Sequence, residues 1–142
     1  MRGPAYPRPM LTVDVVVLSA SPAPAVLLVE RANHPFRGRW ALPGGFVDEG
    51  ERVADAALRE LSEETALELH ALELLGVYDT PGRDPRGWTV SVVYLASLPA
   101  QAAVTGGDDA REACWFSFDA LPELAFDHAA IVSDALRRGA DR

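Results

Sequence analysis

Hydrophobic residues occur in several short runs that are rich in β-branched side chains and are separated by polar, glycine or proline residues. Runs of this length and composition are typical of buried β-strands. They predict strands over residues 11–18, 25–30, 68–78, 89–98 and 111–116. A shorter apolar segment at 40–42 leads into a glycine turn. Residues 19–24, which include the turn-forming residues 21–24, separate the first two strands, so we expect these strands to pair as a hairpin.

Two other stretches repeat apolar residues at helical spacing. The first helix is predicted over 52–65, and one face of it carries Ala54, Ala57, Leu58, Leu61 and Thr65. The second is predicted over 127–138, with Asp127 as its N-terminal cap. Because the strands flank two helices without regular strand-helix-strand alternation, the pattern predicts an α/β sandwich around a mixed β-sheet rather than a Rossmann fold.

The length and charge of the chain narrow its class. A chain of 142 residues, 49% hydrophobic, suits one globular domain over residues 1–142. A formal net charge of -8 disfavours binding to nucleic acid or an anionic membrane, since both attract basic surfaces. No apolar stretch has the form of a signal peptide or the length of a membrane span. We therefore expect a cytoplasmic protein with a small-molecule partner.

The first predicted helix carries an unusual acidic pattern. Glu60, Glu63 and Glu64 stand at positions i, i+3 and i+4, which places their carboxylates on one helical face. Such a face suits a hard cation such as Mg²⁺, which could neutralise diphosphate oxygens and activate a water molecule. A solvated acidic face is the alternative, because neighbouring like charges cost only roughly a few tenths of a kcal/mol.

The surrounding residues 45–67 resemble the Nudix box, which reads glycine, five residues, glutamate, seven residues, then Arg-Glu-apolar-x-Glu-Glu-x-Gly-apolar. Every specified position matches except Ala66, which replaces a glycine. The chain is thereby identified as a member of the Nudix hydrolase family, and the resemblance implies a Nudix-type α/β/α sandwich. Glycine after a helix commonly adopts a left-handed backbone, so we predict that conformation, with strain, for Ala66.

The resemblance also implies roles for the box residues. Mg²⁺, or Mn²⁺, is expected to bind Glu60, Glu63, Glu64 and the Gly45 carbonyl, sometimes with Glu51 nearby. Arg59 is expected to orient the carboxylates. The general base varies within the family, so the catalytic set comprises the three box glutamates together with a distal candidate. That candidate is Glu112, with Asp108 and Asp109 as competitors.

Segments beyond the box resemble the ADP-ribose pyrophosphatase branch, namely 12–14, 35–36, 40–47, 78–87 and 126–128. This branch hydrolyses ADP-ribose to AMP and ribose 5-phosphate, and it suggests a homodimer. Arg83 and Arg86 could hold a diphosphate or ribose phosphate, or could belong to a turn stabilised by Asp79 and Asp84. Tyr6 could stack on adenine, or could cover the core or a dimer contact.

Alternative functions use the same residues. The runner-up enzyme is an oxidised nucleoside triphosphate pyrophosphohydrolase, since the same box serves both reactions. A different class is the non-catalytic, ADP-ribose-sensing Nudix-like regulator, which carries an added DNA-binding domain. Only a short segment follows Asp127 here, and the acidic charge opposes DNA binding. A silent ligand-binding module is a further reading, which the complete set of box glutamates weakens.

Overall fold

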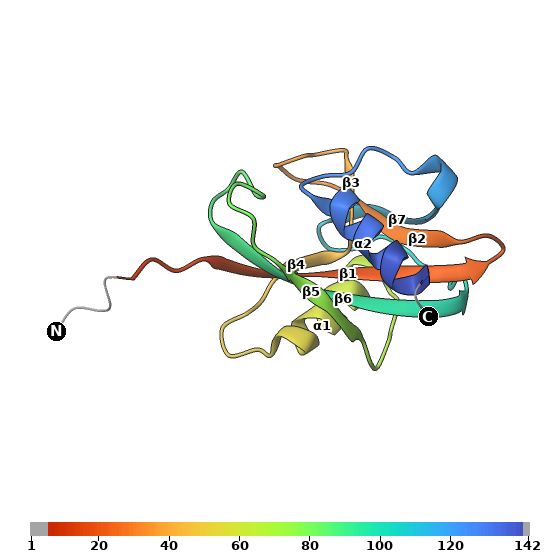
Figure 1. The fold of residues 1–142 in the computed structure, drawn as a ribbon, viewed down its shortest axis with the longest axis horizontal. Helices are drawn as coiled ribbons and strands as arrows, with labels where there is room; N and C mark the ends of the chain where they lie inside the picture. Colours follow the sequence, from red (N-terminus) through yellow and green to blue (C-terminus); the bar gives the residue numbers. More distant parts are fainter. Residues whose placement is uncertain (1–5, 141–142) are drawn as a thin grey trace.

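The computed structural model describes residues 6–140, and Figure 1 shows the arrangement of its elements. Seven strands, two α-helices and one short 3-10 helix follow one another along this part of the chain. In chain order they are β1 (Met10–Ser21), β2 (Ala25–Arg31), β3 (Trp40–Ala41), β4 (Gly44–Phe46), α1 (Val53–Thr65), β5 (Glu73–Tyr78), β6 (Thr89–Ala100), β7 (Ala110–Ser117), η1 (Phe118–Ala120) and α2 (His128–Ala140).

The strands form one mixed sheet. Its main path is β3-β2-β1-β6-β5, while β4 pairs with β1 and β7 pairs with β2. The two long strands β1 and β6 run parallel, and the other pairs are antiparallel. The antiparallel pairing of β1 and β2 confirms the expected hairpin.

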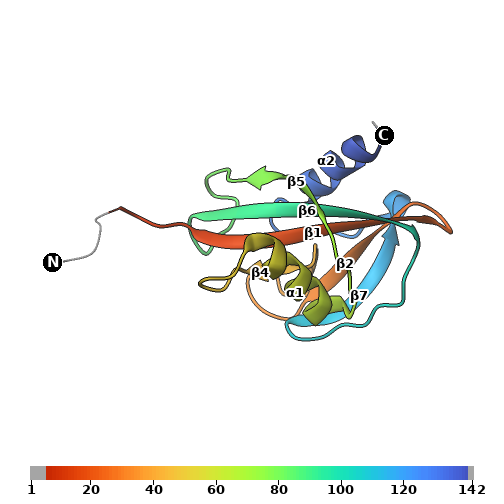
Figure 2. The ribbon, with the colours of Figure 1, turned by 90° about the horizontal axis from the view of Figure 1, so that it is seen from below.

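The two helices cover opposite faces of this sheet (Figure 2). Side chains alternate along β1, so Val13, Val15 and Val17 pack in the cluster that contains α1 residues. Val16 packs instead in the cluster that contains Ile131 and other α2 residues. The central strand is therefore buried on both sides, and the predicted α/β/α sandwich with a mixed sheet is confirmed.

Three local predictions need correction. The strand predicted over 68–78 begins only at Glu73, because the chain leaving α1 is irregular and inserts Leu67, Leu69 and Leu72 into the core without joining the sheet. A turn was expected at residues 43–45, but Gly44 and Gly45 belong to the strand β4, which pairs with β1. On α1, Ala54 is exposed while Ala56 is buried, so the buried face is rotated from the predicted one.

The end of α1 confirms the prediction made for Ala66. This residue has φ 63° and ψ 8°, a left-handed backbone, and its N–H donates to the carbonyl of Ser62. A residue with a side chain rarely adopts this conformation, which costs on the order of 1–2 kcal/mol. Alanine therefore occupies a position that favours glycine.

The second helix begins directly after Asp127, but the side chain of that residue does not serve as the predicted cap. Its carboxylate receives two hydrogen bonds from Arg83, and its backbone carbonyl accepts hydrogen bonds from Ala130 and Ile131. Among residues 6–140, neither helix is long and apolar enough to cross a membrane.

Candidate active site

A cleft of about 280 Å³ opens between the glycine segment before α1 and the loop 79–88. It is lined by side chains from β1, the end of β2, β4, α1 and the segment before α2. Charged residues of both signs face it, among them Arg31, Glu60, Glu64, Arg86 and Asp109. The sheet, the glycine segment and the loop 79–88 thus enclose a polar cleft, and the acidic face of α1 forms one of its walls.

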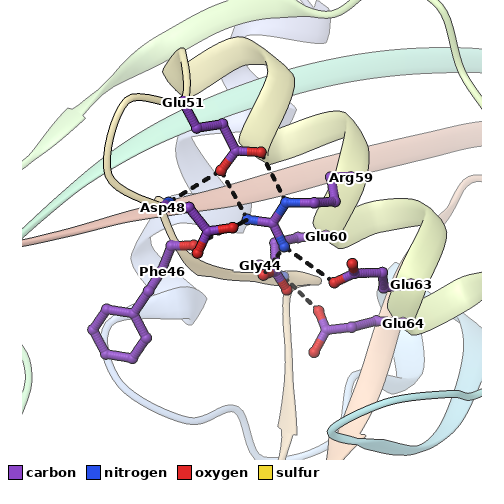
Figure 3. A network of polar contacts seen from close by, with 8 residues as sticks. All are labelled: Gly44, Phe46, Asp48, Glu51, Arg59, Glu60, Glu63 and Glu64. Carbon is purple, nitrogen blue, oxygen red and sulfur yellow. Dashed lines mark hydrogen bonds and ion pairs between the residues drawn. The ribbon is translucent and has the colours of Figure 1, made fainter.

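Arg59 organises the carboxylates of the box, as the resemblance implied (Figure 3). Its guanidinium donates to both oxygens of Glu51, at 2.8 and 2.9 Å, and to one oxygen each of Glu60 and Glu63, at 2.8 and 3.1 Å. It also donates to the backbone carbonyl of Phe46. The hydrogen bonds from Arg59 lower the pKa of Glu51 to about 2, so this carboxylate stays ionised.

Two box carboxylates are withdrawn from solvent. Glu64 is only 6% exposed, and one of its oxygens accepts a hydrogen bond of 2.7 Å from the backbone N–H of Gly44. Burial raises the pKa of Glu64 to about 8. Burial also raises the pKa of Glu60, although Arg59 opposes the shift. Both groups lie where a positive charge would favour their ionised forms.

The donor set fits a hard divalent cation. The candidate side chains supply carboxylate oxygens, and the backbone of Gly45 approaches Glu60 so closely that an added Cβ would lie 2.6 Å from the carboxyl carbon. Within residues 6–140, no three acidic, histidine or cysteine side chains already converge as a ready-made metal site. The hydrogen bonds of Arg59 occupy oxygens of Glu60 and Glu63, so these side chains must share their oxygens with any bound ion.

The candidate bases lie in different places. Glu112 is exposed on β7, opposite Glu30 of β2, and is not among the residues that line the cleft. Asp109 does line the cleft and accepts a hydrogen bond from the amide of Asn33. Asp108 is exposed and has φ 54°. The strand β7 begins just after Asp109 and places Glu112 opposite Glu30, so the two candidates lie on different parts of this segment.

Arg83 and Arg86 both line the cleft, and both are already paired. Arg83 donates two hydrogen bonds to Asp127, at 2.9 and 2.7 Å. Arg86 donates two to Asp84, at 3.1 and 2.8 Å. Burial acts to raise the pKa of Asp84, but the hydrogen bonds from Arg86 outweigh it and lower that pKa. The ion pair with Asp84 was foreseen for this loop, whereas the pairing of Arg83 with Asp127 was not.

Tyr6 lies apart from these groups. It belongs to the segment before β1, which extends away from the rest of the chain (Figure 1). Its side chain is 81% exposed, and it is not among the residues that line the cleft. Within a single chain, the structure does not bring Tyr6 to the other candidate residues.

Sequence reasoning gave no role to a buried polar group, Asp14, Ser91 and His128, of which Asp14 and His128 line the cleft. Asp14 accepts a hydrogen bond of 2.5 Å from Ser91, and its other oxygen lies 3.5 Å from Nε2 of His128. Nδ1 of His128 accepts a hydrogen bond of 3.0 Å from the N–H of Leu42. Burial lowers the pKa of His128, in keeping with a neutral imidazole. The charge of Asp14 in the middle of an apolar strand was the available signal.

The comparisons with known proteins agree with this geometry. A family model described as the NUDIX domain matches residues 8–136, so the chain belongs to the NUDIX family of hydrolases. An ADP-ribose pyrophosphatase of Methanocaldococcus jannaschii is 44% identical over 132 residues, which cover 93% of this chain and 76% of that protein.

A transcriptional repressor and a solved NUDIX domain are also similar. The ADPR responsive transcriptional repressor NtrR of Acinetobacter baylyi is 36% identical over 94% of this chain, which spans only 55% of the repressor's length. The solved NUDIX domain of Shewanella oneidensis NrtR, complexed with ADP ribose, superposes with a TM-score of 0.88 at 36% identity. That match covers 94% of this chain and 90% of the solved one.

Proposed function

We propose that this protein hydrolyses ADP-ribose to AMP and ribose 5-phosphate. One observation carries the proposal: Glu60 and Glu64 line a cleft that also contains arginines, and Arg59 holds Glu63 beside Glu60. The identity of 44% to an ADP-ribose pyrophosphatase supports ADP-ribose as the substrate. The likeness to a NUDIX domain that was solved with ADP ribose supports it further.

Nudix hydrolases generally use divalent metal ions, and Mg²⁺ is the proposed cofactor here, with Mn²⁺ able to replace it. Glu60, Glu63, Glu64 and the carbonyl of Gly45 would hold the metal. When bound, it would neutralise diphosphate oxygens and lower the pKa of a water molecule. Arg59 keeps the side chains of Glu60 and Glu63 in place, while the N–H of Gly44 fixes that of Glu64.

The box glutamates are proposed as the catalytic groups, since they lie at or beside the cleft. For the distal base, the position of Asp109 in the cleft supports it over Glu112. A Glu112→Gln variant with near-normal kcat and an Asp109→Asn variant with reduced kcat would bear out this choice. The reverse result would restore Glu112 as the distal base.

The substrate is tested by a panel of ADP-ribose, nucleotide sugars, dinucleotides, ATP and 8-oxo-dGTP at matched concentration with Mg²⁺. We expect ADP-ribose to give the highest kcat/KM, with AMP and ribose 5-phosphate as products identified by chromatography. A clear preference for 8-oxo-dGTP would instead assign the chain to oxidised nucleotide hydrolysis.

The similarity to the repressor supports one second candidate, a domain that binds ADP-ribose without hydrolysing it. Calorimetric titration with ADP-ribose distinguishes the two functions. Tight binding with no product after prolonged incubation with Mg²⁺ would favour the sensor. Homodimerisation and a cytoplasmic location stay predictions that these comparisons leave open.

A further inference from the structure

Three arginines line the cleft, and they differ in their partners. Arg83 and Arg86 each have a carboxylate that accepts two of their hydrogen bonds. Arg31, by contrast, forms no ion pair with any carboxylate of residues 6–140. Arg83 and Arg86, the two candidate phosphate-binding residues from the sequence, therefore each have a direct carboxylate partner, and Arg31 does not.

The position of Arg31 is fixed by its surroundings. It is the last residue of β2, and its backbone exchanges hydrogen bonds with the loop that follows, through Gly38 and Arg39. Its Nε donates to the carbonyl of Pro35 at 2.7 Å, and its guanidinium lies 5.0 Å from the ring centre of Phe126. These contacts use one of five N–H donors, so the terminal nitrogens remain without a described protein acceptor.

Arg31 and Arg86 lie close together at this side of the cleft. Arg86 also lies over Phe126, with its guanidinium 5.5 Å from the ring centre, so two cations share one aromatic ring. Burial lowers the pKa of the half-buried Arg31, and the charge of Arg86 adds to this lowering, while the charges of nearby carboxylates, Glu64 first, act to raise it. A partly desolvated guanidinium that makes no direct ion pair is costly, and a phosphate that accepts its hydrogen bonds would relieve part of that cost.

We propose that Arg31 is the side chain that binds a phosphate group of the nucleoside diphosphate substrate, while Arg83 and Arg86 mainly shape the wall of the cleft. Guanidinium groups bind phosphate through two parallel hydrogen bonds, and Arg31 has free terminal donors for such a pair. Glu60 and Glu64 line the same cleft, so the diphosphate would lie between Arg31 and the acidic face of α1. This inference rests on the proposed diphosphate substrate.

The test compares binding of ADP, which carries the diphosphate, with binding of adenosine, which does not. Both are titrated calorimetrically into the metal-free protein and its variants. We expect Arg31→Gln to weaken ADP binding about tenfold or more and to leave adenosine binding unchanged. Arg31→Lys keeps the charge but loses the planar fork, so we expect an intermediate loss.

Arg39→Gln is the matched control, because Arg39 lies in the neighbouring loop, pairs with the exposed Glu123 and does not line the cleft. This variant should bind ADP as the wild type does. Arg86→Gln should weaken ADP binding less than Arg31→Gln does. Thermal unfolding of each variant shows whether a loss of ADP binding comes from misfolding. If Arg31→Gln is misfolded, ADP binding by Arg31→Lys decides the outcome.

The proposal is overturned if Arg31→Gln binds ADP normally, if Arg86→Gln has the larger effect, or if the wild type does not distinguish ADP from adenosine. These outcomes are separate from failure of the ADP-ribose assignment. That assignment depends on the substrate panel, whereas the titration needs only a nucleoside diphosphate and no turnover.

Discussion

At Ala66 the chain keeps an alanine in a left-handed conformation at the end of α1. Glycine would relieve strain on the order of 1–2 kcal/mol but would lose part of this gain to the entropy of the unfolded chain. We predict that Ala66→Gly raises the midpoint of reversible thermal unfolding by a few degrees, as expected for roughly 1 kcal/mol in a domain of this size. Turnover should change little, because the substitution removes no carboxylate.

Ala54 provides the control for this prediction. It is exposed in the same helix, where the backbone is right-handed, so Ala54→Gly should lower the unfolding midpoint. Scanning calorimetry on the two variants measures both changes in the unfolding midpoint, a rise for Ala66→Gly and a fall for Ala54→Gly. A fall in the midpoint of Ala66→Gly would mean that the left-handed helix end does not carry the strain described.

Just before Gly44 and Gly45, the N–H of Leu42 donates a hydrogen bond to Nδ1 of His128 at the start of α2, and Leu42 also packs with α2 residues in the core. His128→Leu would leave a buried N–H unsatisfied, at a cost of about 1–3 kcal/mol. We predict that this variant lowers the unfolding midpoint by several degrees and weakens Mn²⁺ binding, measured by calorimetry, because Gly44 and Gly45 follow Leu42 closely.

His128→Asn is the matched variant, since its side-chain oxygen can replace Nδ1 as the acceptor for Leu42. It should recover most of the loss in both measurements. Equal losses in His128→Asn and His128→Leu would show that the contact with Leu42 does not position the glycine segment.

At the level of elements, the sequence predicted the strands and helices that follow a clear period, including α1 and the pairing of β1 with β2. It predicted the strand 68–78 too early, because Leu67, Leu69 and Leu72 are apolar for packing and not for sheet pairing. It missed β4, since Gly44 and Gly45 signal a turn while their pairing depends on β1. The spacing of apolar residues indicates which side chains are buried, but it does not specify which backbone segments pair in the sheet.

In the candidate site too, the sequence predicts what local spacing determines and does not predict contacts that depend on the fold. The box fixed Glu60, Glu63 and Glu64 on one helical face because helical spacing alone determines it. The partners of the arginines could not be predicted, because Arg83 and Asp127 meet only through the packing of the loop 79–88 against the start of α2. Arg31 ends a strand, where an arginine is commonly solvated, so only the fold shows that it lines the cleft.

In the whole molecule, stability and pH are linked through Glu64. Its pKa is about 8 in the folded protein, raised mainly by burial, against an ordinary value of 4.5. A carboxyl whose pKa is raised by folding stabilises the fold fully below its unfolded pKa, and this contribution is lost as pH rises toward the folded pKa. Metal-free wild type should therefore lose stability between about pH 4.5 and about pH 8 relative to Glu64→Gln.

Scanning calorimetry of both proteins in EDTA, at about pH 5 and about pH 8, measures this relation. The unfolding midpoint of Glu64→Gln minus that of the wild type should increase as pH rises. A difference that is independent of pH would contradict the raised pKa. Mg²⁺ should raise the midpoint of the wild type more than that of the variant, because the ion binds the ionised carboxylate.

The central claim is that the acidic face of α1 drives metal-dependent hydrolysis of ADP-ribose, and Glu64→Gln tests it most directly. Glutamine retains an oxygen for the N–H of Gly44, so the fold should survive while a metal ligand is weakened. The measurement is kcat for ADP-ribose with Mg²⁺, with circular dichroism on the same samples. We predict that kcat falls at least about a hundredfold in a folded variant and that EDTA abolishes wild-type turnover. Near-normal kcat in folded Glu64→Gln, or wild-type turnover that persists in EDTA, would contradict the account.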